Sequence, residues 1–70
     1  MNLLEVDVDE KVEVLEVDGL YQQRLSALGF VEGCEVCPLR KNGGTLLVDV
    51  KGCRYMLGNE LAECILVRRL

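Results

Sequence analysis

Turn residues divide most of this chain into short segments, and this division limits the folds that it can adopt. Glycines stand at positions 19, 29, 33, 43, 44, 52 and 58 of the 70 residues. The intervening segments are too short for long helices, and several are rich in β-branched or alternating apolar residues. The spacing predicts a mainly β protein, a small barrel or rolled sheet of short antiparallel strands.

Five segments have the composition of strands. They are residues 12–17, 34–40, 45–50, 54–57 and 64–68. The alternation of Leu46, Val48 and Val50 with more polar residues predicts a half-buried strand. The apolar phase slips between Val14 and Leu15, which predicts a bulge in the first strand. Residues 42–44 and 51–52 have the chemistry of tight hairpin turns.

One short helix is expected between the first two strands. Tyr21, Leu25 and Leu28 recur at helical spacing and predict one apolar face. Gly29 is placed to take the left-handed conformation that ends a helix, and Phe30 can then fold back onto Leu25. The helix should therefore end at this point in the chain.

Two further local features complete the expected fold. Asp18 precedes the helix and is a candidate to cap it. Residues 58–62 are too few for a stable helix and are expected to form a single turn. The sequence therefore predicts one domain over residues 1–70, with about five strands and one short helix after the first strand.

Composition excludes several classes of function. The chain has no His to act as an ordinary acid–base group and is too short to enclose a large cofactor, so we expect neither an enzyme nor a cofactor. The net charge of −4 argues against a nucleic-acid partner. The apolar runs are too short to span a membrane, and the acidic start is unlike a signal peptide. A cytoplasmic location with reduced thiols is the expectation.

The charge is distributed unevenly along the chain. Residues 1–18 hold seven acids and one base, whereas residues 19–70 hold five acids and seven bases. The simpler interpretation is a solvated acidic edge. The alternative is a weak electrostatic docking surface.

Four cysteines raise the question of a metal or redox site. Cys34 and Cys37 have the spacing of a metal clip, but a strand would point them to opposite faces. They also follow a helix instead of opening one, which is unlike a redox pair. A site built from all four thiolates, with Cys53 and Cys64 added, stays open as an alternative. Otherwise the cysteines are small hydrophobic or surface residues.

A longer pattern resembles the FeoA family, the small cytosolic components of bacterial ferrous-iron uptake. The first half carries Arg24-Leu25-x-x-Leu28-Gly29-Phe30-x-x-Gly33. The second half carries Gly52, Leu57-Gly58, Ala62, Ile65 and Val67. The resemblance covers about residues 3 to 68. It departs from the family at Val8-Asp9, in a short hairpin loop and at the cysteines, none of which is a family signature.

The resemblance implies an SH3-like barrel and a non-enzymatic partner of FeoB, the membrane ferrous-iron transporter with a GTPase domain. Two alternatives remain: a protein that binds Fe²⁺ or Zn²⁺ through its cysteines, and a stand-alone regulatory module of the type that ends iron-dependent repressors. The outward face of the expected hairpin carries Leu39 and Leu47. These leucines are the candidate partner contacts, and no catalytic, cofactor or metal residue is assigned.

Overall fold

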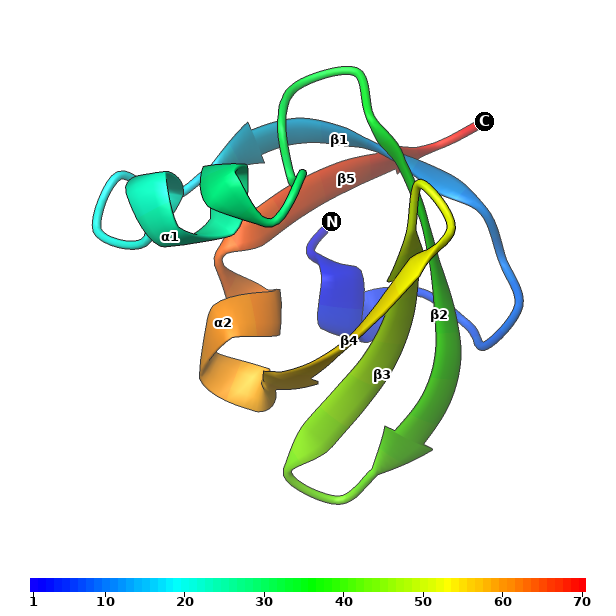
Figure 1. The fold of residues 1–70 in the computed structure, drawn as a ribbon. Helices are drawn as coiled ribbons and strands as arrows, with labels where there is room; N and C mark the ends of the chain where they lie inside the picture. The colour runs from blue at the N-terminus through cyan, green and yellow to red at the C-terminus, as the bar shows by residue number, and fades with distance from the viewer.

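Five antiparallel strands form one curled sheet in the order β4-β3-β2-β1-β5 (Figure 1). The computed structural model describes residues 1–70. The strands are β1 (Val12–Val17), β2 (Glu35–Asn42), β3 (Thr45–Val50), β4 (Cys53–Gly58) and β5 (Ile65–Arg69). The helical elements are η1 (Leu3–Glu5), α1 (Gln22–Ala27) and α2 (Asn59–Glu63). The mainly β prediction with a short helix after the first strand is confirmed.

The hairpin turns form where the sequence predicts them. Gly43 and Gly44 join β2 to β3, and Gly43 has a φ of +53°. Lys51 and Gly52 join β3 to β4, with φ values of +53° and +82°. Positive φ at such positions gives a turn whose twist matches that of the flanking strands. The two turns therefore bring β2, β3 and β4 together as a continuous antiparallel meander.

Each of two strands contains an irregularity. The register of β1 against β5 shifts between Val14 and Glu16, which confirms the expected bulge. The register of β2 against β3 shifts between Pro38 and Arg40, so Leu39 has no directly paired residue. The sequence does not signal this second bulge, because it depends on the partner strand.

The end of α1 follows the prediction in detail. The N–H of Phe30 donates to the C=O of Leu25 at 3.0 Å, and the N–H of Gly29 donates to the C=O of Ser26 at 3.0 Å. These two bonds define a Schellman motif, and Gly29 supports it with a φ of +105°. Phe30 and Leu25 are both buried, so the motif also returns the chain to the core.

Asp18 has a different role from the one expected. Its Oδ1 accepts a hydrogen bond from the N–H of Leu20 at 3.0 Å. The helix itself starts after Tyr21, which makes no side-chain cap. Asp18 thus stabilises the turn before α1. The prediction that it caps the helix is wrong, because the N-cap position is three residues further on, at Tyr21.

Helical structure extends beyond the single helix that the sequence predicts. Residues 59–63 continue the expected turn into the short helix α2. Residues 3–5 form the 3₁₀-helix η1, which lies inside the curl of the sheet (Figure 1). Asn2 caps η1 through the N–H of Leu4 at 2.9 Å, and Glu5 accepts from the N–H of Asn2 at 2.8 Å. This capping box fixes the start of the chain against the core.

The core is one cluster of fifteen buried residues drawn from every strand, both α-helices and the N-terminal segment. Leu3 and Val6 belong to it and are fully buried. The acidic N-terminal region is therefore not only a solvated edge, because its apolar residues complete the core. No helix of the structure is long and apolar enough to cross a membrane.

The two terminal strands of the sheet, β4 and β5, do not pair with each other. The outer edge of β5 is covered by the start of the chain: Asn2 forms a bridge with Leu66, and the N–H of Val67 donates to the C=O of Met1 at 2.9 Å. No strand pairs with the outer edge of β4. The sheet therefore ends in one covered strand and one open strand.

Candidate interaction surface

The outer face of β2, β3 and β4 carries a short row of apolar and basic side chains. Leu47 lies directly between Arg40 on β2 and Met56 on β4. Residues that face one another in an antiparallel sheet share the same side of it. Leu47 is half-buried, and 55% of Met56 is exposed. This row is the apolar centre of the outer face.

The two predicted contact residues do not occupy equivalent positions. Leu47 lies within a regular ladder, whereas Leu39 lies at the bulge of β2. Both side chains are half-buried, not fully exposed. A half-buried leucine can still contribute to a contact, because burying its remaining apolar area is favourable. Their role as partner contacts stays a prediction.

Met56 is a surface residue that sequence reasoning missed. The sequence predicts a strand at residues 54–57, but it does not show which side chains of that strand point outward. Their direction depends on the register of β4 with β3. The Lys51-Gly52 turn fixes that register and pairs Met56 with Leu47. Pairing residues outward from the Lys51-Gly52 turn places Arg54 opposite Asp49 and, two residues further along each strand, Met56 opposite Leu47.

Asp49 and Arg54 face each other on the same surface without forming an ion pair. They are directly paired residues of β3 and β4. The carboxylate of Asp49 instead accepts a hydrogen bond from the N–H of Gly52 at 3.2 Å. The ion pairs of the structure lie at the other end of the sheet, where Arg68 meets Glu13 and Arg69 meets Glu10. The exposed guanidinium of Arg54 therefore has no carboxylate partner.

The meander and the N-terminal region differ in charge. Residues 40–58 contain four bases and one acid, a net charge of +3 in a chain whose total is −4. Lys41 is directed away from the outer face: its Nζ donates to the C=O of Leu4 at 3.1 Å and joins the hairpin to η1. Of the two neighbouring bases of β2, Arg40 and Lys41, only Arg40 therefore belongs to the outer row.

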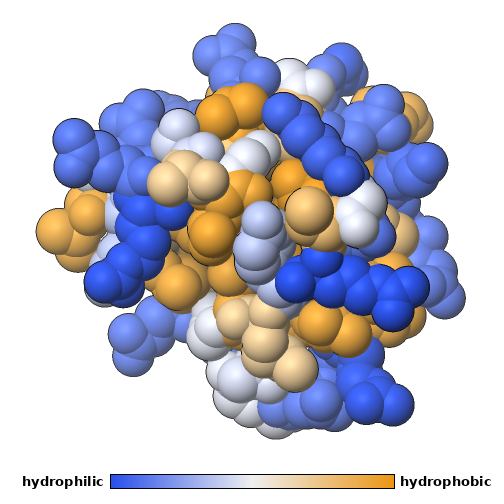
Figure 2. Space-filling model, in the orientation of Figure 1, coloured by the Kyte–Doolittle hydropathy of each residue, from blue (hydrophilic) through white to orange (hydrophobic).

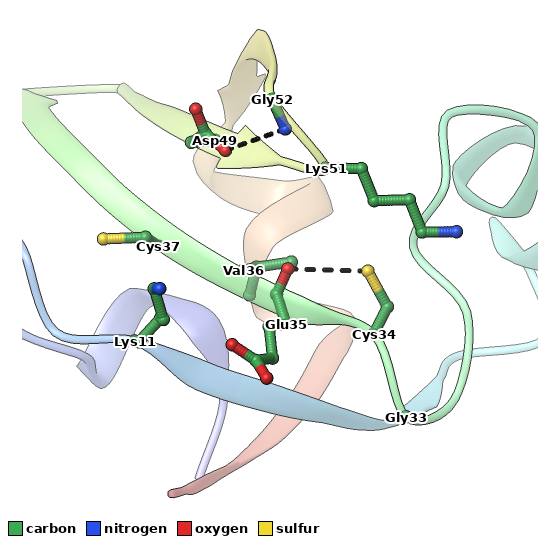
Figure 3. Close-up of a pocket in the computed structure, with 9 residues that line it drawn as sticks. All are labelled: Lys11, Gly33, Cys34, Glu35, Val36, Cys37, Asp49, Lys51 and Gly52. Carbon is green, nitrogen blue, oxygen red and sulfur yellow. Dashed lines mark hydrogen bonds between the residues drawn. The ribbon is translucent and has the colours of Figure 1, made fainter.

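Cys34 and Cys37 lie on opposite sides of the chain, as the strand interpretation predicts. Cys34 is buried at 8% exposure within the core, and Cys37 is half-buried on the outer side of β2. Figure 3 shows the two side chains leaving the chain in different directions, without converging on a common point. The Sγ of Cys34 donates to the C=O of Glu35 at 3.5 Å, and that of Cys37 to the C=O of Pro38 at 3.7 Å. The backbone does not turn between them to form a clip.

A hollow of about 470 Å³ lies beside this pair (Figure 3). Lys11 and Lys51 border it, together with Asp49. Burial, reinforced by the charge of Asp9, raises the pKa of the Cys37 thiol above its ordinary value of 9.0. A raised pKa keeps the sulfur protonated at neutral pH, whereas a metal ligand or a redox nucleophile needs the thiolate. The hollow therefore does not activate Cys37.

The remaining cysteines, Cys53 and Cys64, do not line that hollow. Cys53 is exposed at the start of β4, and Cys64 lies between α2 and β5. Burial, together with Asp18 and Glu63, raises the pKa of the Cys64 thiol above 9.0. No group of three or more His, Cys, Asp or Glu side chains is placed to hold a metal ion.

These features define a class of protein: a small SH3-like β domain with an open terminal strand and an outer face of apolar and basic residues. The chain belongs to the FeoA family, because the FeoA domain model matches residues 1–69. This family is associated with ferrous iron transport. The family resemblance inferred from the sequence is thereby confirmed.

Solved structures agree with this assignment. The zinc complex of Stenotrophomonas maltophilia FeoA, described as a prokaryotic SH3 domain protein, is 33% identical, with a TM-score of 0.89 over 97% of this chain and 89% of that one. Chlorobium tepidum FeoA is 28% identical, with a TM-score of 0.89 over 100% of this chain and 70% of that one. A FeoA-like protein of Clostridium acetobutylicum is 26% identical, with a TM-score of 0.90 over 100% and 86%.

The same fold occurs in a protein of another function. Part of a manganese-dependent transcriptional repressor has a TM-score of 0.90 at 18% identity, and the match covers 36% of that chain. At this identity the likeness shows a shared fold alone. A search of curated proteins gave no match.

Proposed function

We propose that this chain is a non-enzymatic accessory protein of ferrous iron transport that docks onto the cytosolic part of a FeoB-type transporter and modulates its GTP hydrolysis. The observation that carries the proposal is the FeoA domain match over residues 1–69, in a chain of 70 residues. With one small domain and no His, the chain has little means of acting except through a partner.

The outer face of the meander supports docking. Protein interfaces combine an apolar centre with polar residues at the rim, and arginine is enriched in them. Leu47 and Met56 supply an apolar centre here, and Arg40 and Arg54 flank it. Leu39 adds apolar area at the bulge. We assign the partner contact to this face.

The test is capture of the purified cytosolic domain of FeoB by this chain, together with the rate of GTP hydrolysis by that domain. We expect capture and a change in the hydrolysis rate when the chain is added. The matched control is the variant Leu47→Asp, which introduces a charge at the centre of the proposed contact. Absence of capture together with an unchanged hydrolysis rate for the wild-type chain would refute the proposal.

A further inference from the structure

The backbone of β4 has unused hydrogen-bonding groups along its outer edge. Hydrogen-bonded pairs alternate along an antiparallel ladder, and a two-residue turn closes on a bonded pair. The turn at Lys51-Gly52 closes on Val50 and Cys53, so Tyr55 and Leu57 also direct their backbone groups toward β3. The N–H of Asn59 donates to the C=O of Gly44 at 3.0 Å, which is the next bonded pair in the same alternation.

The intervening residues of β4 are therefore directed outward. They are Arg54, Met56 and Gly58, and all three are exposed. No strand of the chain covers them, because β4 is the end of the sheet. Natural proteins usually protect such an edge with charged side chains, proline or a covering element. This edge carries a single charge, Arg54, and no proline.

The side chains of β4 present a different chemistry on each side of the edge. The outer side carries Arg54 and Met56, which pair with Asp49 and Leu47. The inner side carries Tyr55, which is half-buried and 6.2 Å from Phe30 between ring centroids, and the buried Leu57. A strand added here would place alternate residues beside a free guanidinium and beside an apolar inner surface.

A hollow of about 540 Å³ lies at the Gly58 end of the edge. Tyr21 and Leu61 give it apolar walls, and Arg24 and Glu60 add one base and one acid. Arg24, like Arg54, forms no ion pair in the structure. The carboxylate of Glu60 lines this hollow, so the positive charge without an acidic partner along the edge is that of Arg54. Figure 2 shows hydrophobic residues across the middle of this side of the molecule, bordered and interrupted by hydrophilic residues.

We propose that the outer edge of β4 binds an extended segment of a partner protein in which acidic and apolar residues alternate. The segment adds to the sheet as a sixth strand through the N–H and C=O of Arg54 and Met56 and the N–H of Gly58, whose C=O already begins α2. Its acidic side chains lie on the outer side, beside Arg54, and its apolar side chains lie beside Tyr55. This inference deepens the proposed function by naming the docking edge, and it rests on that function only for the identity of the partner.

Charge favours such a segment over a second copy of this chain. Pairing two β4 edges would extend one continuous sheet and bring together two meanders that each carry a net charge of +3 over residues 40–58. Like charges disfavour that arrangement, whereas an acidic segment is attracted to it.

The test uses the isotope-labelled chain and two synthetic peptides, one of alternating Glu and Val and one of alternating Lys and Val. On addition of the Glu–Val peptide, we expect the amide hydrogens of Arg54, Met56 and Gly58 to shift and to exchange more slowly. Those of Tyr55 and Leu57 already bond to β3, so their exchange should change little. Equal binding of the Lys–Val peptide, or protection of the odd-numbered amides instead, overturns the proposal.

Two variants sharpen the result. Met56→Pro removes an outward N–H without removing a bond to β3, and Met56→Thr is its control because it keeps that N–H. We expect Met56→Pro to lose peptide binding and Met56→Thr to keep it. Arg54→Glu leaves the backbone unchanged and should bind the Glu–Val peptide about tenfold more weakly, the scale of one charge-assisted contact. Unchanged binding by Arg54→Glu contradicts the acidic preference.

The oligomeric state and the transporter give independent controls. Sedimentation of the chain alone should show a monomer, and a dimer that dissociates on Met56→Pro would assign the edge to a second copy and overturn the proposal. The peptide experiment contains no transporter, so its failure removes the docking edge alone. Failure of FeoB capture removes the proposed function alone.

Discussion

The N–H of Phe30 reaches back to the C=O of Leu25 at 3.0 Å across Gly29, and this bond directs the chain from α1 into the core. The bond requires a left-handed residue at position 29, where φ is +105°. A side chain there would also meet the Cγ1 of Val50 at 3.4 Å. That distance is an ordinary van der Waals contact, so the requirement for glycine at this position comes from the backbone conformation.

Gly29→Ala should lower the free energy of unfolding by about 1–2 kcal/mol, because a non-glycine residue is strained in the left-handed region. Urea denaturation followed by circular dichroism measures the change. Gly19→Ala is the matched control, since Gly19 has no positive φ and open space around its Cβ position. If both substitutions have the same effect, the role assigned to Gly29 is incorrect.

Leu3→Ala should be one of the more destabilising substitutions in the N-terminal region. Leu3 is fully buried in η1, and removing a buried leucine side chain typically costs about 2–5 kcal/mol. Leu20→Ala is the control, because 79% of Leu20 is exposed. Urea denaturation of both variants would show a large effect only for Leu3. Equal midpoints would mean that η1 is not part of the folded core in solution.

The two cysteines of the Cys34–Cys37 pair should respond differently to serine. Cys34→Ser places a hydroxyl in the core and should cost about 1–3 kcal/mol, reduced where the hydroxyl keeps the bond to Glu35. Cys37→Ser lies on the outer side and should change stability by less than about 0.5 kcal/mol. Thermal or urea unfolding of each variant is the measurement. Equal losses would indicate that the two thiols share one environment.

Raised thiol pKa values predict how stability depends on pH. Burial raises the pKa of Cys37 and Cys64 in the folded chain above 9.0, so the folded state retains these protons longer than the unfolded state. The resulting stability is present below pH 9 and is lost as the pH rises through the folded pKa values. Urea midpoints measured across this range for the wild type and for Cys37→Ala/Cys64→Ala test the prediction. A wild-type decline no steeper than that of the variant would contradict it.

Leu47→Asp should weaken capture of the FeoB cytosolic domain by about tenfold or more, because it places a carboxylate at the centre of the proposed contact. Leu66→Asp is the control: Leu66 is 41% exposed, but it lies on β5 at the other end of the sheet. Binding curves for both variants, with folding checked by circular dichroism, give the comparison. Equal weakening by the two variants would place the contact elsewhere.

The elements predicted best are those defined by local chemistry. Glycine and its neighbours define the end of α1 and the turns at residues 43–44 and 51–52, because each needs a backbone conformation that few residues adopt. The alternation in β3 likewise identifies its buried face without knowledge of its partners. These features depend only on a few neighbouring residues, so they can be predicted from the sequence alone.

The features that were missed depend on distant parts of the chain. Lys41 turns inward because the C=O of Leu4 accepts its hydrogen bond, and Leu39 leaves the ladder because of its register with β3. η1 had a local signal, the capping box of Asn2 and Glu5, but its burial depends on the curl of the sheet. The outward direction of Met56 also follows from pairing. Sequence patterns describe segments well and their mutual placement poorly.

The unequal ends of the sheet have a consequence for assembly. The start of the chain occupies the outer edge of β5 through the Asn2–Leu66 bridge, while β4 stays open. A filament grown by joining end strands needs two free ends on every unit, since each unit must receive one neighbour and offer a place to the next. This domain has one free end strand, β4. Association through end strands therefore stops once β4 is paired, and the result is a complex of two partners and not a filament.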